Sequence, residues 1–150
     1  MKSTPPGWPR ISSALFYEDP AKAIDWICHA FGFEVRIKVE EGGKIHHSEL
    51  TFGEGVIMVG DAASTAPHAK AFTSPRSVGG ANTQSLFVYV DDVEAHCERA
   101  RAAGAKILSE PKTTDYGEEY WSDRGYGCED PEGHQWWFAQ RVRSAKEKTT

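Results

Sequence analysis

Residues 15–20 read LFYEDP, and residues 86–92 read LFVYVDD. Each stretch begins with apolar and aromatic residues that favour a β-strand and ends with acidic residues that favour a turn into a helix. Both predicted helices carry residues typical of helix ends. These are Asp19, Pro20 and Gly32 in the first copy and Asp92 and Gly104 in the second. The chain therefore contains an internal repeat that starts with a strand and a helix.

Three further strand-like segments follow each predicted helix. The first helix carries an apolar stripe at i, i+3, i+4 and i+7 spacing, formed by Ile24, Ile27, Cys28 and Phe31. The strand-like segments are 33–39, 44–52 and 56–60 in the first copy, and 106–108, 119–128 and 134–140 in the second. A polar stretch through residue 114 follows the segment that ends at 108. The sequence thus predicts an α+β fold of two tandem βαβββ modules with eight strands.

The repeat divides the chain into five parts. We expect an N-terminal extension over residues 1–10, a first module over 11–60 and a second module over 84–141. The segment 61–83 is rich in Ala, Ser, Thr, Pro and Gly and predicts an inter-module loop, which at this length is usually functional or mobile. Residues 142–150 predict a frayed tail.

Composition narrows the class of protein. The net charge of −5 argues against nucleic-acid binding, which usually requires a basic face. No stretch approaches the ~20 apolar residues that span a bilayer, and residues 1–10 lack the apolar core of a signal peptide. The three scattered cysteines, Cys28, Cys97 and Cys128, favour free thiols over a disulfide framework. We therefore expect a cytoplasmic protein with neither a membrane nor a nucleic acid as partner.

Four segments carry a resemblance to a known family. They are residues 17–33 (YEDP through AFGF), 55–58 (GVIM), 88–96 (VYVDDVEAH) and 130–134 (DPEGH). In this order and spacing they resemble the glyoxalase/bleomycin-resistance/dioxygenase superfamily, also called the vicinal oxygen chelate superfamily. The resemblance implies that the eight strands form a cupped mixed sheet of two half-barrels with the helices outside. It also implies a homodimer, for which Trp8, Trp121 and Trp136 are candidate interface anchors.

Enzymes of this superfamily commonly hold a divalent metal with His, Glu or Gln side chains from the first and fourth strands of each module. Spacing from the helix caps and the DPEG turn places these positions at Ser12, Met58, Ser85 and Trp137. These residues do not form an ordinary metal site, because Trp offers no lone pair and Met prefers soft ions. The sequence therefore predicts no metal and no other cofactor. A shifted alignment leaves an alternative site, drawn from His46, His47, Glu49, Glu119 and His134.

Without a metal, the same cup is expected to be an apolar and aromatic binding cavity. Strand parity and the superfamily resemblance give its candidate ligand-binding residues, which are Phe16, His47, Met58, Phe87, Tyr89, Trp121, Gln135 and Trp137. The segment 116–121 places Glu118 and Glu119 among three aromatic residues, which suits a planar cationic ligand.

The function that follows is sequestration of an aromatic or cationic organic molecule, as in the drug-binding branch of the superfamily. Two alternatives remain open. One is a metal-dependent lyase, isomerase or dioxygenase with non-standard ligands. The other is a metal-free enzyme that uses His47 or Tyr89 as general acid or base.

Overall fold

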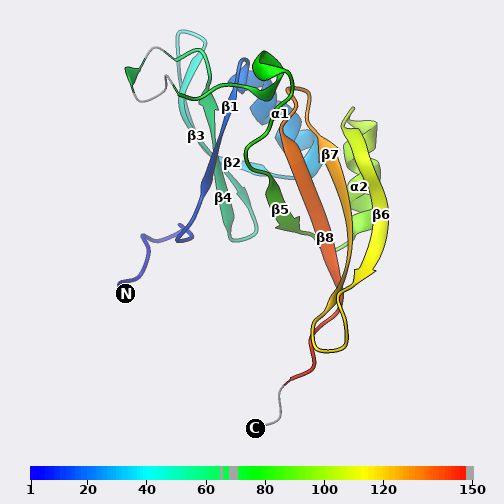
Figure 1. Cartoon of the computed structure of the whole chain (residues 1–150). Helices are drawn as coiled ribbons and strands as arrows, with labels where there is room; N and C mark the ends of the chain where they lie inside the picture. The colour runs from blue at the N-terminus through cyan, green and yellow to red at the C-terminus, as the bar shows by residue number, and fades with distance from the viewer. Residues whose placement is uncertain (65, 68–70, 148–150) are drawn as a thin grey trace. The chain divides into compact units, whose positions relative to one another are not determined.

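The computed structural model describes residues 1–64, 66–67 and 71–147, and the chain divides into two compact units, Met1–Gly80 and Ala81–Thr150. Each unit has the element order strand, helix, strand, strand, strand (Figure 1). The predicted α+β class with two βαβββ repeats is confirmed. Among the described residues no helix is both long enough and apolar enough to cross a membrane.

The first unit holds a four-stranded mixed sheet with the order β1-β4-β3-β2. β1 runs parallel to β4, and the other neighbours are antiparallel. Its elements are β1 (Ser13–Tyr17), α1 (Pro20–Phe31), β2 (Glu34–Glu41), β3 (Lys44–Phe52), β4 (Gly55–Asp61) and the short 3-10 helix η2 (Pro75–Val78).

The second unit repeats this sheet with the order β5-β8-β7-β6. β5 runs parallel to β8, and β6, β7 and β8 are antiparallel neighbours. Its elements are β5 (Leu86–Tyr89), α2 (Val93–Ala102), β6 (Lys106–Asp115), β7 (Ser122–Glu129) and β8 (Gln135–Arg143).

The helices begin where the capping pattern predicts. Asp19 accepts a hydrogen bond from the backbone N–H of Lys22 at 3.1 Å, and Asp92 accepts one from the N–H of Ala95 at 3.0 Å. Each carboxylate satisfies a backbone donor that the helix leaves without a partner. Gly32 closes α1 in the left-handed conformation that a glycine adopts without strain.

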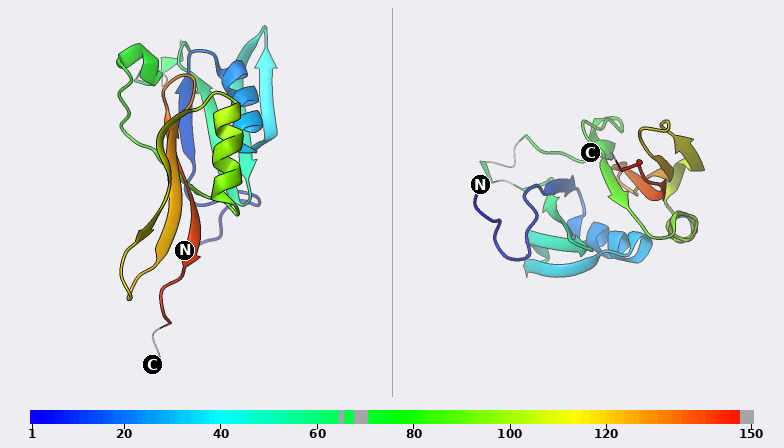
Figure 2. Two further views of the ribbon diagram at one scale, coloured as in Figure 1. Left: turned by 90° about the vertical axis from the view of Figure 1, so that its right-hand side faces the viewer. Right: turned by 90° about the horizontal axis from the view of Figure 1, so that it is seen from below.

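In each unit the helix covers one face of the sheet, and the apolar core lies between them (Figure 2). The core of each unit is made of large side chains that are almost fully buried. They are Leu15, Tyr17, Ile24, Ile27, Phe31, Leu50 and Val59 in the first unit, and Val93, Cys97, Tyr126, Cys128, Trp136 and Phe138 in the second.

Three details differ from the predictions. The sixth strand does not end at Leu108 but continues to Asp115. Its outer half pairs with β7, and its side chains there are mostly exposed, so that no apolar pattern marks it as a strand. Ile11 shares strand parity with the buried Leu15, which predicts that it packs on the helix, but it is 87% exposed. Trp136, expected as an interface anchor, is fully buried, and its indole N–H donates to Asp130 at 3.1 Å.

Candidate functional site

The second sheet has an open aromatic face on the side away from α2. Phe87 on β5 and Gly127 on β7 both lie opposite Trp137 on β8. Tyr89 lies opposite Ala139, two residues further along β5 and β8. Residues directly opposite each other, and those two apart on one strand, share a face of the sheet. Phe87 is 61%, Tyr89 48% and Trp137 37% exposed. Three rings therefore face solvent together on one sheet.

Trp137 lies across Gly127. A Cβ atom at Gly127 would stand 2.7 Å from the indole ring, closer than any real contact allows. The glycine therefore lets the ring lie against the backbone of the neighbouring strand, with its outer face exposed. An exposed flat ring in this position can stack with a planar ligand.

A carboxylate and an arginine lie at one end of the same face and are named here the Asp123 cluster, comprising Tyr89, Trp121, Asp123 and Arg141. The Tyr89 hydroxyl donates to Asp123 Oδ2 at 2.9 Å, and Arg141 Nε donates to Oδ1 at 2.6 Å. Arg141 also donates to the Tyr89 hydroxyl. Its guanidinium carbon lies 5.3 Å from the Tyr89 ring centre and 5.0 Å from that of Trp121.

The contacts of this cluster fix its protonation. Partial burial of the Tyr89 phenol, and then its hydrogen bond to Asp123, raise the pKa of Tyr89 above the usual tyrosine value. The hydrogen bond to Asp123 raises the pKa of Arg141. At neutral pH the cluster therefore contains a protonated phenol and a paired guanidinium.

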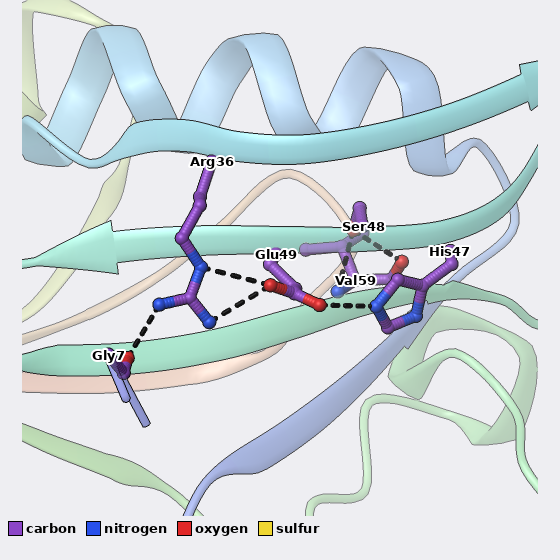
Figure 3. Close-up of polar contacts among 6 residues, drawn as sticks. All are labelled: Gly7, Arg36, His47, Ser48, Glu49 and Val59. Atoms are coloured by element: carbon purple, nitrogen blue, oxygen red, sulfur yellow. Dashed lines mark hydrogen bonds and ion pairs between the residues drawn. The ribbon is translucent and has the colours of Figure 1, made fainter. Parts of the chain in front are cut away.

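The first unit holds a second group of this kind, the Glu49 cluster, comprising Trp8, Arg36, His47 and Glu49. Figure 3 shows the contacts of Arg36, His47 and Glu49. Glu49 is buried on β3, and its Oε1 accepts from Arg36 Nε at 2.9 Å. Its Oε2 lies 2.7 Å from His47 Nε2. Arg36 also donates through Nη1 to the carbonyl oxygen of Gly7 at 2.6 Å, and its guanidinium lies 4.7 Å from the Trp8 ring centre.

A β-bulge brings Arg36 to this position. Val35 lies opposite Leu50 and Ile37 lies opposite Glu49, so Arg36 is an extra residue on β2. Such a residue leaves the regular alternation of the strand, and its side chain can turn toward the other face. The bond to His47, opposed by burial and assisted by Arg36, lowers the pKa of Glu49 below the usual glutamate value. The cluster is therefore a buried carboxylate held ionised by two basic side chains.

Phe16 also lies across a glycine, but a second ring covers it. A Cβ atom at Gly60 would stand 2.8 Å from the Phe16 ring. Phe72, from the segment after β4, stacks on Phe16 with ring centres 4.2 Å apart and an angle of 3° between the ring planes. The outer face of the Phe16 ring is thus covered by Phe72, whereas the outer face of the Trp137 ring is exposed to solvent.

The remaining predicted residues lie on equivalent strands of the two units. Met58 on β4 pairs with Ala14, and Trp137 on β8 pairs with Phe87. Ala14 and Phe87 each stand five residues before the aspartate that caps the following helix, so Met58 and Trp137 occupy equivalent positions. Gln135 begins β8, and its backbone N–H donates to Asn82 at 3.1 Å.

The polar residues of both clusters were only partly predicted from the sequence. His47, Tyr89 and Trp121 were candidates, whereas Arg36, Asp123 and Arg141 were not. Glu49 was considered only as a metal ligand. Asp123 and Arg141 share strand parity with Gly127 and Trp137, and this parity is the signal that places them on the same face.

Comparison with known proteins identifies the family. The family model described as the Glyoxalase/Bleomycin resistance protein/Dioxygenase superfamily matches residues 10–138. The chain belongs to this superfamily.

Relatives in the superfamily cover most of the chain. Uncharacterized proteins of Mycobacterium bovis (Mb0911c) and Mycobacterium tuberculosis (Rv0887c) are both 32% identical to it over 136 residues, covering 90% of this chain and 85% and 76% of theirs. Among solved structures, TioX from Micromonospora sp. ML1 is 30% identical, with a TM-score of 0.68 over 89% of this chain and 99% of TioX. TnmS3, an antibiotic binding protein from Streptomyces sp. CB03234, shares the fold with 21% identity and a TM-score of 0.62, over 87% and 93% of the two chains.

The side chains that sequence spacing places at the superfamily's metal positions do not fit a divalent cation. The Ser12 hydroxyl is buried and has no hydrogen-bond partner in the described part of the chain, and it is a neutral oxygen. Met58, Ser85 and Trp137 offer no carboxylate or imidazole. Across residues 1–64, 66–67 and 71–147 there is no group of three or more His, Cys, Asp or Glu side chains placed to hold a metal.

Proposed function

We propose that this superfamily member binds a small aromatic or cationic organic molecule and acts by sequestering it without a metal. The observation that carries the proposal is the row of exposed rings on the second sheet, formed by Phe87, Tyr89 and Trp137. On the same sheet Trp136 and Phe138 are buried, whereas these three rings are exposed to solvent.

The energetics of this row support a ligand-binding role. Aromatic side chains bring a large apolar area to a contact, and stacked pairs contribute about 0.5–1.5 kcal/mol beyond burial of that area. Contiguous exposed apolar patches commonly mark binding sites. The description of TnmS3 as an antibiotic binding protein agrees with this type of ligand, but at 21% identity the argument rests on the side chains of this chain.

A thermal-shift screen tests the proposal. Planar aromatic compounds of neutral, anionic and cationic charge are added separately to the full chain, and the midpoint of unfolding is measured. A compound present at 100 times its Kd is expected to stabilise the protein by about 2.7 kcal/mol. Trp137→Ala is expected to weaken binding of the best compound by roughly tenfold, because the stacking surface is lost.

Val142→Ala is the matched control for Trp137→Ala. Val142 is exposed on the same strand, but it lies five residues from Trp137, as the extra residue at the register shift between Arg141 and Arg143. This variant is expected to bind the compound as the wild type does. Absence of stabilisation by every class of compound, or equal loss of binding in both variants, would contradict the proposal.

The metal-free, dimeric and cytoplasmic parts of the proposal have separate tests. Metal analysis of protein purified without chelator is expected to find less than one equivalent of Ni, Zn, Fe or Mn, and a full equivalent would favour the metal-dependent alternative. Sedimentation velocity is expected to give the mass of a homodimer. Fractionation of the source cells is expected to recover the protein in the cytoplasmic fraction.

A further inference from the structure

The Asp123 cluster bears on which ligands the open face accepts, because a cation of the chain itself occupies it. The Arg141 guanidinium lies within the ~6 Å range of cation–π attraction to both the Tyr89 and the Trp121 ring. Trp121 is one of the three aromatic residues of segment 116–121 that the sequence predicts to suit a cationic ligand. We propose that Arg141 is a specificity-determining residue that makes this face select planar aromatic compounds bearing an acidic group over cationic ones. The inference rests on the proposed binding function.

Both oxygens of the Asp123 carboxylate already have partners within the cluster, so this group adds little attraction for a cationic ligand. Asp123 uses Oδ1 to accept from Arg141 and Oδ2 to accept from Tyr89. Asp123 is buried, whereas the Arg141 side chain is 36% exposed. A ligand that approaches this end of the face therefore meets the exposed cation before the buried anion.

Arg141 also has the donors that an acidic ligand needs. A guanidinium carries five N–H donors. Hydrogen bonds to Asp123 and Tyr89 use the Nε donor and one Nη2 donor. A ligand carboxylate or phenolate can accept from the others while its ring stacks on Trp137 in the neighbouring rows of the same face.

Other charged side chains surround the rows of this face. Lys112 on β6 lies opposite Gly125, and Arg143 is paired with Asp115 at 2.8 Å. Glu129 lies opposite Gln135, at the end of the face away from Arg141. Glu129 is a carboxylate of this face from which a cationic ligand could gain attraction, and Glu129→Gln removes that contribution without changing Arg141.

Three probes with one ring system and different charges test the selection. They are naphthalene-2-carboxylate, naphthalene-2-carboxamide and 2-naphthylmethylammonium, and their Kd values are measured by calorimetry on the full chain. Wild type is expected to bind the carboxylate at least tenfold more tightly than the ammonium compound. Arg141→Gln is expected to reverse this order, because it exposes both rings and leaves Asp123 without its cation.

Arg143→Gln is the matched control. Arg143 is on the same strand, but it lies opposite Ser122 beyond a register shift, and its ion pair is with Asp115. This variant is expected to keep the wild-type order of the three probes. Asp123→Asn is a second variant, which keeps Arg141 and removes its counter-charge; it is expected to bind the carboxylate probe more tightly, and it replaces Arg141→Gln if that variant does not fold.

The possible failures are distinguishable. If the ammonium probe binds wild type as tightly as the carboxylate does, or if Arg141→Gln keeps the wild-type order, Arg141 does not determine specificity, although the proposed function survives. If none of the three probes binds wild type, and the broader screen also gives no ligand, the proposed function fails and this inference fails with it.

Discussion

Each unit contains a buried carboxylate that is paired with an arginine, but the two pairs are formed in different ways. In the first unit Glu49 on β3 meets Arg36, which a bulge on β2 turns toward it, and His47 contacts its second oxygen. In the second unit Asp123 on β7 lies directly opposite its arginine on β8, and the phenol of Tyr89 contacts its second oxygen. One arginine lies within a bulge, whereas the other lies directly opposite its carboxylate, just before a register shift.

The two carboxylates also occupy positions that are not equivalent in the repeat. Leu50 in the first unit and Cys128 in the second each lie opposite the residue just before the equivalent Met58 and Trp137 positions. Glu49 precedes Leu50, so its counterpart in the second unit is Gly127, not Asp123. The repeat thus extends to the backbone and the core but not to the charged groups, and each cluster belongs to its own unit.

The largest effect is expected where the two units differ inside the sheet, at the equivalent positions Ser48 and Tyr126. The buried Ser48 hydroxyl accepts from the Val59 N–H at 2.9 Å and donates to the Val59 carbonyl at 2.7 Å. Ser48→Ala leaves two buried backbone groups without partners and is expected to lower the free energy of unfolding by roughly 2–4 kcal/mol. Tyr126→Phe removes a hydroxyl bonded to His96 at 2.6 Å and is expected to cost about 0.5–1.5 kcal/mol.

Urea denaturation measures both free energies. Ser85→Ala is the control, since Ser85 is exposed, and it is expected to change the free energy of unfolding by less than about 0.5 kcal/mol. Equal losses for Ser48→Ala and Tyr126→Phe would show that the two units tolerate a lost buried hydroxyl alike.

A smaller effect is expected at the two glycines beneath aromatic rings. Gly60→Ala forces a Cβ atom against Phe16, which Phe72 holds from above, and is expected to cost about 1–3 kcal/mol. Gly127→Ala is expected to cost less, because the exposed Trp137 ring can move away. It is instead expected to abolish stacking of a planar ligand on that ring.

Chemical denaturation and probe titration separate the two outcomes. In a Phe72→Ala background the cost of Gly60→Ala is expected to fall, because the Phe16 ring is then released on its outer side. An unchanged cost in that background would contradict the role given to Phe72.

The Glu49 cluster is expected to respond to acid. Because the pKa of Glu49 is lowered in the folded protein, its contribution to stability is present above the ordinary glutamate pKa of about 4.3 and is lost as pH falls through the lower folded value. Wild type is therefore expected to exceed Glu49→Gln in thermal midpoint at pH 7, and the gap is expected to close below about pH 4. Glu54→Gln, in an exposed turn, is the control expected to show no such gap, and a gap for Glu49→Gln that persists at pH 2 would refute the assignment.

The smallest effect is expected from the ring beside the first arginine. Trp8→Leu removes the aromatic face that lies 4.7 Å from Arg36, and it is expected to cost about 0.5–1 kcal/mol. Trp8→Phe keeps an aromatic face and is expected to restore most of this difference in urea denaturation. If both variants behave as the wild type does, the Trp8 ring does not support the cluster.

The sequence predicted the parts of the fold that depend on local chemistry. The caps at Asp19 and Asp92 and the apolar stripe through Ile27 could be read from residue type and spacing. The length of the sixth strand could not, because its outer half pairs beyond the helix and has no apolar pattern. Arg36 shows a further limit, since a bulge breaks the period-two rule by which strand residues are assigned to faces.

For the candidate site, strand parity predicts which side chains share a face but not which charges surround them. Phe87, Tyr89 and Trp137 could be placed on one face by parity, and the structure has them on one face. The charges that surround them depend on which residues of β7 and β8 lie opposite each other, and one sequence does not give that register.

The second unit contains two buried cysteines, Cys97 and Cys128, whose reaction with a reagent depends on opening of the core. Burial raises the pKa of Cys128 to about 12, and it also raises the pKa of Cys97 above the usual thiol value. Only the thiolate reacts readily with alkylating reagents, and both sulfurs lie in the core between α2 and its sheet. The rate at which a reagent labels them at neutral pH therefore reports how often this unit opens, without any substitution in the chain.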